Sequence, residues 1–346
     1  MPKRLQLARS IKHLGILRLL EMYKSRPGIL IFNYHRIGDR FSTRFDRHLF
    51  SATMDEFDAQ LIYLKKHFDI VSADKLQELI SGQTKLKQMH VALTFDDGYL
   101  DNYTHAFPVL LANQCTASFF LVPQFVGSAS IPWWDEIAYL FRNTKKHQLT
   151  LQLPIPITIK LDSNRETAIR IALRNFKRPE NVNSVELLAK LREEAACPLP
   201  GVDRRFMNWN EAREMKNAGM SIGSHTQTHP ILGQVTPEAQ QWELEHSKRV
   251  IEENLGSKIC SLAYPIGMRG GFDSATEQIA RSAGYTMCFS FYGGVNAPGN
   301  INATNLLRGN ASVDPEVFRA EAMILSRLGR PLSFLFDRGV KQEALS

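Results

Sequence analysis

Residues 91–99 read VALTFDDGY: an apolar run that ends in two adjacent carboxylates, Asp96 and Asp97, followed by a glycine. The run has the length and apolar character of a strand that is buried on both faces, as strands of a parallel sheet are. In parallel α/β folds, ligands bind where the carboxyl ends of the strands meet. The two carboxylates are therefore candidates for metal binding and base catalysis, although Asp97 here is equally typical of an Asx turn or a helix N-cap.

Short apolar runs alternate with helical patterns on both sides of this stretch. Residues 29–35 form a second continuous apolar run, and further strands are predicted at 68–71, 117–122, 220–223, 259–264 and 285–289. Helices are predicted at 54–67, 73–81, 103–113 and 314–328. The alternation favours an α/β fold with a parallel sheet or barrel. Residues 128–205, which contain Pro132-Trp133-Trp134-Asp135, interrupt it and are interpreted as an insertion between barrel elements.

The composition excludes several classes of protein. The chain has 346 residues, 44% of them hydrophobic and 22% charged, as is ordinary for a globular protein. The four cysteines are scattered without a CxxC pair, which argues against a cysteine-based zinc site or a disulfide scaffold. Residues 1–50 hold eleven Lys or Arg and three Asp or Glu, so they carry +8 and the remainder −1 of the total +7. A basic end of this kind does not predict a nucleic-acid-binding surface.

Residues 3–24 have apolar residues at helical spacing and predict one helix, which ends at Arg26-Pro27-Gly28. A helix packed on the domain is the simpler interpretation, and a membrane-surface helix formed by residues 1–26 is the alternative. Charges at Arg9, Lys12 and Arg18 interrupt any signal-peptide core, and no stretch is long enough to span a membrane. The sequence thus predicts a cytoplasmic protein whose membrane contact, if any, is peripheral.

Two further motifs follow predicted strands. His225 and His229 form an HxxxH pair, which can supply two imidazole ligands to zinc, cobalt, nickel or iron, although the pattern alone is common. Tyr264-Pro265-Ile266-Gly267 reads as a turn that could present a backbone N–H to a pocket, although a plain turn is the simpler interpretation.

The order strand–DDG, strand–HxxxHP, strand–YPxG resembles the polysaccharide deacetylase family, carbohydrate esterase family 4, over residues 29–125 and 205–312. The resemblance implies a distorted (β/α) barrel of about seven parallel strands. It also implies a hydrolase that removes the acetyl group from an N-acetylated sugar. Asp97, His225 and His229 would bind a divalent metal, with zinc preferred over cobalt, nickel or iron(II), and Asp96 would be the general base. A backbone N–H of the turn Tyr264, Pro265, Ile266, Gly267 would hold the oxyanion.

The resulting domain organisation is a basic helix at 1–27, a catalytic domain at 28–312 with the insertion at about 128–205, and a helical tail at 313–346. The implied substrate is an N-acetylated glycan or a lipid-linked sugar, without nucleic acid. Two other functions stay open: a non-enzymatic carbohydrate-binding relic of the fold, and an amidase on a non-sugar acyl amide.

The sequence departs from the family in two places. Ala263 stands where the family has an arginine, and Ile266 where it has an aromatic residue, so a contact between an arginine and Asp96 is expected only if Arg269 replaces the lost one. The family also has a C-terminal histidine that acts as general acid, whereas no histidine follows His246 here. Some members are circularly permuted, with that strand placed first, so His35 is the candidate acid; a structural histidine is the alternative.

Overall fold

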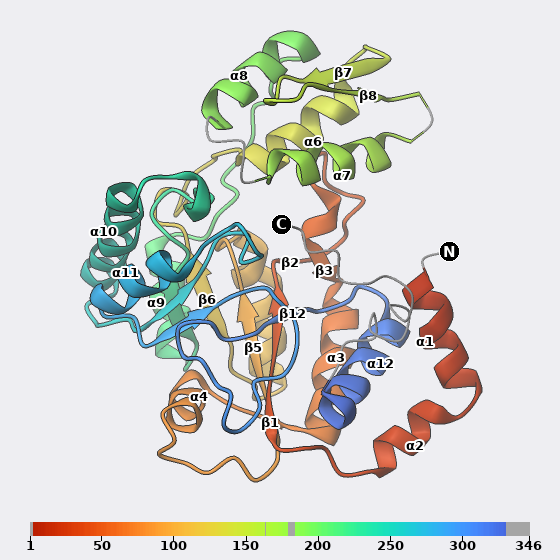
Figure 1. Ribbon diagram of the computed structural model, residues 1–346, viewed down its shortest axis with the longest axis vertical. Helices are drawn as coiled ribbons and strands as arrows, with labels where there is room; N and C mark the ends of the chain where they lie inside the picture. Colours follow the sequence, from red (N-terminus) through yellow and green to blue (C-terminus); the bar gives the residue numbers. More distant parts are fainter. Residues whose placement is uncertain (1–2, 163, 179–183, 330–346) are drawn as a thin grey trace.

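A parallel sheet of seven strands forms the centre of the protein (Figure 1), which the computed structural model describes for residues 3–162, 164–178 and 184–329. Each strand pairs in parallel with its neighbours, and β4 (Asp69–Ile70) pairs with β5 beside this path. The path runs β11 (Met287–Phe289), β10 (Ser261–Ala263), β9 (Ser221–Ser224), β6 (Ser118–Leu121), β5 (Met89–Phe95), β1 (Gly28–Tyr34), β12 (Gly309–Asn310).

The segment at 306–310 joins the two ends of this path. Leu306 forms a parallel bridge with Phe289 of β11, and Gly309 pairs with Phe32 of β1. The sheet therefore curves into a distorted β/α barrel of seven strands, and the predicted fold is confirmed.

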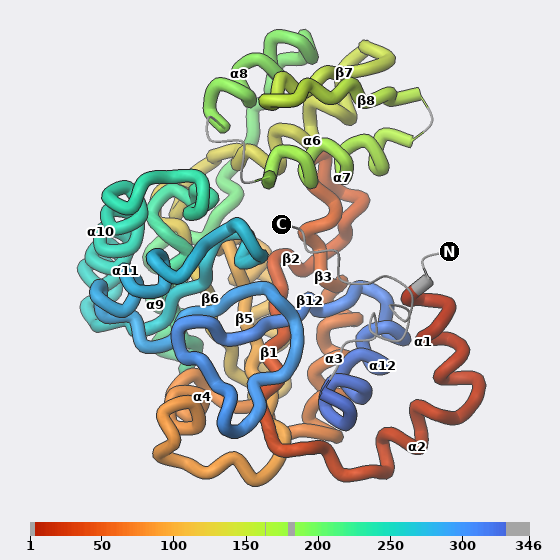
Figure 2. Tube along the Cα trace, viewed as in Figure 1, coloured from red at the N-terminus to blue at the C-terminus, as the bar shows by residue number. Residues whose placement is uncertain are grey.

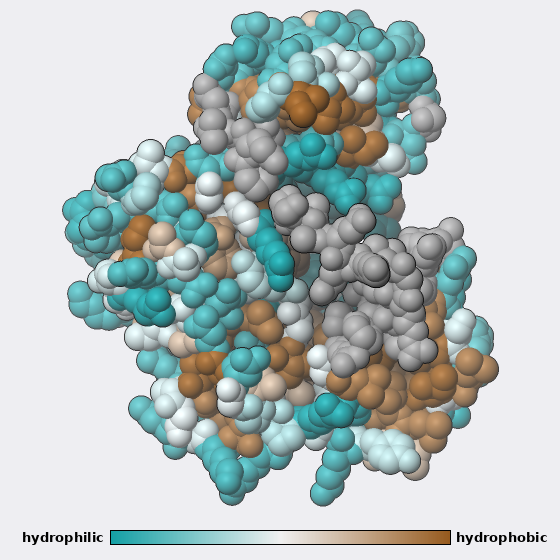
Figure 3. Space-filling view, in the orientation of Figure 1, coloured by the Kyte–Doolittle hydropathy of each residue, from teal (hydrophilic) through white to brown (hydrophobic). Residues whose placement is uncertain are grey.

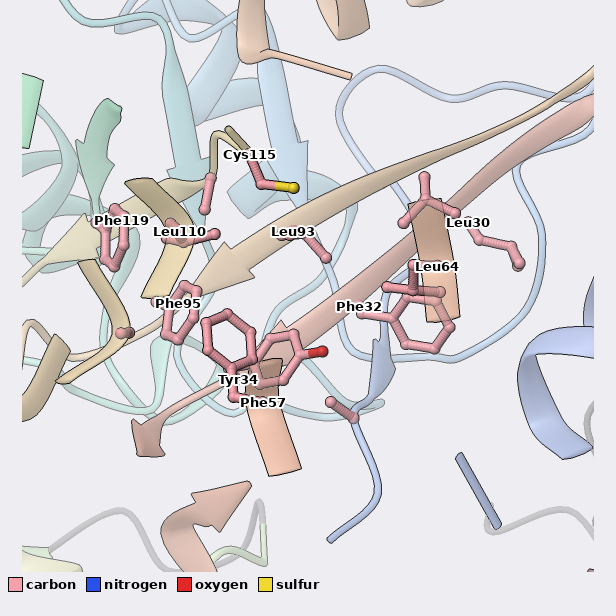
Figure 4. Close-up of a cluster of buried hydrophobic side chains, with 14 of the residues drawn as sticks. Leu30, Phe32, Tyr34, Phe57, Leu64, Leu93, Phe95, Leu110, Cys115 and Phe119 are labelled. Carbon is pink, nitrogen blue, oxygen red and sulfur yellow. The ribbon is translucent and has the colours of Figure 1, made fainter. Parts of the chain in front are cut away.

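β1 and β5 are the longest strands and lie at the core. All their residues are buried, and they pair from Gly28 with Met89 to Tyr34 with Phe95. Figure 4 shows the stack that anchors their ends, in which Phe95 lies between Tyr34 and Phe119 at ring distances of 5.0 and 4.7 Å. Because this register ends both strands together, the residues that follow them, His35 and Asp96, emerge at the same edge.

Helices cover the outside of the barrel, and their ends carry the expected signals. Thr53 and Glu56 form a capping box at the start of α3, and α10 ends at Gly256 with φ 63°. They are α3 (Met54–His67), α4 (Ala73–Ile80), α5 (Phe107–Ala112), α9 (Trp209–Asn217), α10 (Pro237–Leu255), α11 (Ser274–Ser282) and α12 (Pro315–Leu328). A π-helical turn, Asn102–Ala106, precedes α5.

The N-terminal segment forms two helices, α1 (Lys3–His13) and α2 (Ile16–Met22), so the prediction of one continuous helix is wrong. The break lies at Gly15, whose φ of 71° no helix interior adopts. Both helices contact α12, and Arg9 and Lys12 pair with Glu316 at its start. No helix of the described part of the chain is long and apolar enough to cross a membrane.

The insertion forms a separate layer above one end of the barrel (Figures 1 and 2). Its apolar side chains make a hydrophobic cluster of their own, joined by Tyr99, Val122, Phe125 and Phe206 from the flanking segments. Its elements are α6 (Trp133–Asn143), β7 (Gln148–Leu151), β8 (Ile157–Lys160), α7 (Arg165–Phe176) and α8 (Ser184–Ala195).

Candidate metal and catalytic site

Four strands end at one edge of the barrel and carry all the predicted site residues. His35 follows β1, Asp96 and Asp97 follow β5, His225 and His229 follow β9, and the turn at 264–267 follows β10. These segments line one cavity of about 880 Å³, together with residues of α7 and the N-terminus of α6. The volume is that of a site for a small ligand or a segment of a polymer.

Asp97, His225 and His229 come together as the motifs predict. Asp97 Oδ1 lies 3.6 Å from His225 Nε2 and 3.4 Å from His229 Nε2, and one ligand atom of each residue lies within 4.8 Å of the others. For ligand bonds of about 2.0–2.2 Å in tetrahedral geometry, neighbouring ligand atoms lie roughly 3.3–3.6 Å apart. The spacing therefore fits a metal with open coordination positions.

The hydrogen bonds of these residues also fit a cation. Asp97 Oδ1 is buried without a hydrogen-bond partner among the described residues, which is costly unless a cation faces it. His225 Nδ1 lies 2.7 Å from the carbonyl oxygen of Ala263, so its N–H points there and the Nε2 lone pair faces Asp97. Burial lowers the pKa of both His225 and His229, and neutral imidazole is the form that binds a metal.

The backbone at the site is strained. Only six non-glycine residues of the described chain have positive φ, and four of them lie here: Asp97, Thr226, His229 and Ile266. Each such residue costs on the order of 1 kcal/mol or more, and this kind of strain clusters at functional sites. Glu243 of α10 holds the HxxxH turn, since its carboxylate accepts the N–H groups of Gln227 and Thr228 at 2.7 and 2.8 Å.

Arg308 contacts Asp96, which corrects the expectation that only Arg269 could do so. Its guanidinium donates to Asp96 Oδ1 and Oδ2 at 2.8 and 2.9 Å, whereas Arg269 is exposed. Asn33 of β1 donates to Asp96 Oδ2 at 2.9 Å. Arg308 could not be predicted from the sequence, because the segment around it belongs to no recognised motif.

The two carboxylates consequently differ in acidity. Burial alone would raise the pKa of Asp96, but the charge of Arg308 and its hydrogen bonds to the carboxylate hold that pKa well below its usual range. Burial and the neighbouring Asp96 and Asp135 raise the pKa of Asp97 well above its usual range. Asp96 is thus ionised and held in place, whereas Asp97 forms no ion pair with a lysine or arginine of the described residues.

Within the turn at 264–267, one backbone N–H has no hydrogen-bond partner among the described residues. The N–H of Tyr264 donates to Phe289 O at 3.0 Å, and that of Gly267 donates to Pro265 O at 2.6 Å. Pro265 has no N–H, so Ile266, which lines the cavity, keeps the one N–H of the turn without a partner in the described chain. The candidate oxyanion donor narrows from four residues to Ile266.

His35 is half-buried and lines the cavity with Asp96 and His225. Burial lowers its pKa to about 4, although the charge of Asp96 acts in the opposite direction. The ring is therefore neutral near pH 7 in the ligand-free protein. Its role as an acid stays a prediction.

The insertion contributes to the site, which the sequence did not indicate. The Trp134 ring lies 4.4 Å from that of His229, and Trp134 Nε1 donates to Tyr99 Oη at 2.9 Å. Tyr99 Oη donates in turn to Asp135, which also pairs with Arg205 at 2.6 Å. This buried network fixes α6 against the metal-site residues.

Comparison with known proteins gives the family. The model of the family described as "Polysaccharide deacetylase" matches residues 83–153 and 177–288, which is more than half of the chain. The chain is 23% identical over 258 residues to the putative polysaccharide deacetylase YxkH of Bacillus subtilis, with 74% of this chain and 62% of that protein covered. It is 30% identical over 114 residues to poly-beta-1,6-N-acetyl-D-glucosamine N-deacetylase of Escherichia coli K12, with 32% of this chain and 16% of that protein covered. The chain thus spans less than two thirds of the length of these relatives.

Solved structures share the fold. The deacetylase PplD of Streptococcus pyogenes, in complex with acetate, matches with a TM-score of 0.56 at 19% identity, covering 87% of this chain and 99% of that one. IcaB from Ammonifex degensii matches with a TM-score of 0.57 at 19% identity, covering 88% and 98%. The family model matches the two segments that contain the DDG, HxxxH and YPxG motifs. This chain therefore belongs to the polysaccharide deacetylase family, carbohydrate esterase family 4.

Proposed function

We propose that the chain is a metal-dependent hydrolase that removes the acyl group, typically acetyl, from the nitrogen of an N-acylated sugar in a glycan or glycan precursor. The observation that carries the proposal is the pairing of two features in one cavity. A buried triad, Asp97, His225 and His229, fits a divalent cation, and an ionised carboxylate, Asp96, lies beside it in an ion pair with Arg308. A carbohydrate-binding relic would have no use for a metal-ligand triad beside that carboxylate.

In the proposed reaction, water adds to the amide carbonyl, the C–N bond breaks, and a carboxylate and an amine are released. Bound at the triad, zinc, or cobalt, nickel or iron(II) in its place, would polarise the carbonyl and lower the pKa of a bound water. Asp96 accepts the proton of the attacking water, and Arg308 keeps that carboxylate ionised and oriented. The N–H of Ile266 donates to the developing oxyanion. His35 delivers a proton to the leaving nitrogen, because an amide anion is a very poor leaving group.

The test is acetate release from a panel of N-acetylated substrates after loading with zinc: neutral oligosaccharides, sugar phosphates, lipid-linked sugars and simple N-acyl amides. We expect release from sugar substrates, and loss of it in Asp96→Asn with metal content retained. Hydrolysis of simple amides alone would identify an amidase instead. Sugar binding without any turnover would identify a relic.

We also propose that α1 and α2 contact a membrane surface. Leu14, Met22 and Tyr23 are 72%, 82% and 68% exposed, and Figure 3 shows a hydrophobic surface over these two helices. Residues 1–27 include seven Lys or Arg and one Glu, and three of these cations, Arg4, Arg9 and Lys12, pair with acids of α12. An apolar surface with surrounding cations is the composition of a helix that lies on anionic lipid.

A further inference from the structure

A stripe of three cations, two on α7 and one at its C-cap, lines the cavity that holds the candidate site. Arg170, Arg174 and Lys177 follow one another at spacings of four and three residues, which places them on one face of the helix, and all three line the cavity. Figure 1 shows α7 on the side of the insertion that faces the barrel.

The three cations have no ion pair among the described residues. Arg170 donates to Thr167 Oγ1 at 3.1 Å, and Lys177 Nζ lies 5.8 Å from the centre of the Trp133 ring. All three residues are exposed. Burial in the cavity lowers the pKa of Lys177, and the charges of Asp46 and Asp97 act on it in the opposite direction. Like charges at this spacing repel each other, and an anion bound between the three side chains would offset that repulsion.

The two other cations among the described residues of the cavity, Arg308 and Arg4, are already paired with carboxylates. Arg308 pairs with Asp96, and Arg4 pairs with Glu321. Asp314 caps α12, and Asp46 accepts the N–H of His48. These hydrogen bonds leave Asp46 and Asp314 charged, so together with Asp97 three carboxylates face the three cations of the stripe. A divalent cation at the triad would therefore make the cavity net positive.

We propose that Arg170, Arg174 and Lys177 bind a phosphate-bearing part of the substrate, so that the enzyme acts on a phosphate-linked N-acylated sugar. This inference rests on the proposed function. A single carboxylate would occupy one arginine, whereas a diphosphate or phosphodiester has enough oxygens and charge to engage neighbouring guanidinium groups. Trp133 stacks on Phe176 at 4.9 Å and lines the cavity beside Lys177, which offers a flat apolar face for the sugar ring next to the anion.

The kinetic test uses the zinc-loaded full chain and three substrates: a neutral N-acetylglucosamine oligomer, an N-acetylglucosamine diphosphate with a short alkyl chain, and an oligomer with phosphodiester links. We expect a lower KM for the phosphorylated substrates. Arg174→Ala/Lys177→Ala should raise that KM by about 10–100-fold, with little change for the neutral oligomer. Lys66→Ala/Lys216→Ala removes the same charge outside the cavity and should change neither. Preference for the alkyl diphosphate would point to a lipid carrier, and preference for the phosphodiester to a polymer.

A binding test separates this inference from the proposed function. Calorimetry with inorganic pyrophosphate on chelator-treated protein should detect binding that weakens with salt and is lost in the Arg174→Ala/Lys177→Ala variant only. If no substrate is turned over but this binding is present, the proposed function fails and the anion site stands. If the double variant behaves as wild type with every phosphorylated probe while the neutral oligomer is deacetylated, the anion site is wrong and the function stands.

Discussion

Arg308 and Asp96 form a buried bidentate ion pair, with two N–H···O bonds of 2.8 and 2.9 Å between residues that lie 212 positions apart in the chain. Arg308 also donates to Ser290 O at 3.0 Å and to Asn33 Oδ1 at 2.9 Å. It is thereby fixed between β11 and β1, in the segment that closes the barrel. Closure of the fold and orientation of the proposed base depend on one side chain.

Replacing Arg308 should therefore affect both stability and activity. Arg308→Gln leaves Asp96 buried without its cation, and breaking a buried pair in this way costs about 3–5 kcal/mol of unfolding free energy. Because Arg308 holds the pKa of Asp96 down, its loss raises that pKa, and the acid limb of the pH–rate profile should move to higher pH. Urea denaturation and the pH dependence of kcat measure the two effects.

The matched control is Arg269→Ala, which removes an exposed arginine of the third motif region. It should leave the pH–rate profile and the unfolding free energy near wild type. The double variant Asp96→Asn/Arg308→Gln should recover much of the lost stability, since no charge is then left unpaired. An unchanged acid limb in Arg308→Gln would contradict the positioning role.

A second prediction concerns the metal. Zinc should raise the melting temperature of the wild-type protein, because a ligand that binds the folded state stabilises it by mass action. Asp97→Asn should lose most of this response and most of its bound metal in elemental analysis. In chelator, the variant should be at least as stable as wild type, because it removes a buried carboxyl that no described lysine or arginine pairs with, and asparagine tolerates the φ of 73°. Zinc binding of unchanged affinity in Asp97→Asn would refute this ligand set.

A third prediction concerns the insertion. Trp134→Ala should lower the unfolding free energy by about 3–5 kcal/mol, the range for truncating a buried aromatic residue. It should also lower metal affinity. His229 has a strained backbone φ of 62°, and the variant removes the ring that packs against its imidazole. Tyr99→Phe removes only the hydroxyl that bonds Trp134 and Asp135, and should cost stability with a smaller effect on metal. Equal metal affinity in all three proteins would show that the insertion does not support the site.

The parts of the site that the sequence predicted are those encoded locally. Asp96 and Asp97 are adjacent at the end of an apolar run, and His225 and His229 lie within one turn, so short motifs suffice to identify them. Their convergence follows from the rule that parallel strands end at one edge. Whether they bind a metal, and which one, stays a prediction.

The parts that the sequence missed depend on distant contacts. Arg308 reaches Asp96 from a segment whose strand, β12, has only two residues, too few for any periodicity. Trp134 stands out in the sequence, but its contact with His229 depends on how the insertion folds back on the barrel.

The break between α1 and α2 was missed for a local reason, because one glycine interrupts a pattern whose apolar spacing continues on both sides.

A fourth prediction tests the membrane contact of α1 and α2. The intact protein should sediment with vesicles that contain anionic lipid at low salt, and less so as salt screens the attraction. Leu19→Glu/Met22→Glu should abolish sedimentation, because it puts charge on the exposed apolar face, while activity on a soluble substrate stays. Val185→Glu changes an exposed apolar residue of α8 instead and should have no effect. Absence of sedimentation by the intact protein at low salt would contradict the proposal.

A fifth prediction concerns His35 as the general acid. His35→Ala should lower kcat by about 10²–10⁴-fold, the usual share of general acid catalysis, with metal content unchanged. Since kcat/KM reports the free protein and burial lowers the pKa of His35 to about 4, the protonated ring becomes scarce above that pH. The descending limb of kcat/KM should thus begin well below pH 6.5 in wild type and be absent in the variant. His246→Ala, outside the cavity, is the control.

The lowered pKa of His35 can also be tested without a substrate, from the pH dependence of folding stability. An unfolded histidine has a pKa of about 6.5, so between pH 6.5 and 4 the unfolded chain binds a proton at His35 that the folded protein does not. Folding stability therefore falls through this window as the pH is lowered, by up to roughly 3 kcal/mol from this residue. His35→Gln should lose less stability over the same window. If both proteins lose the same amount while the variant keeps near-normal activity, then His35 is neither buried as neutral imidazole nor the acid, and the proton must reach the leaving nitrogen from Asp96.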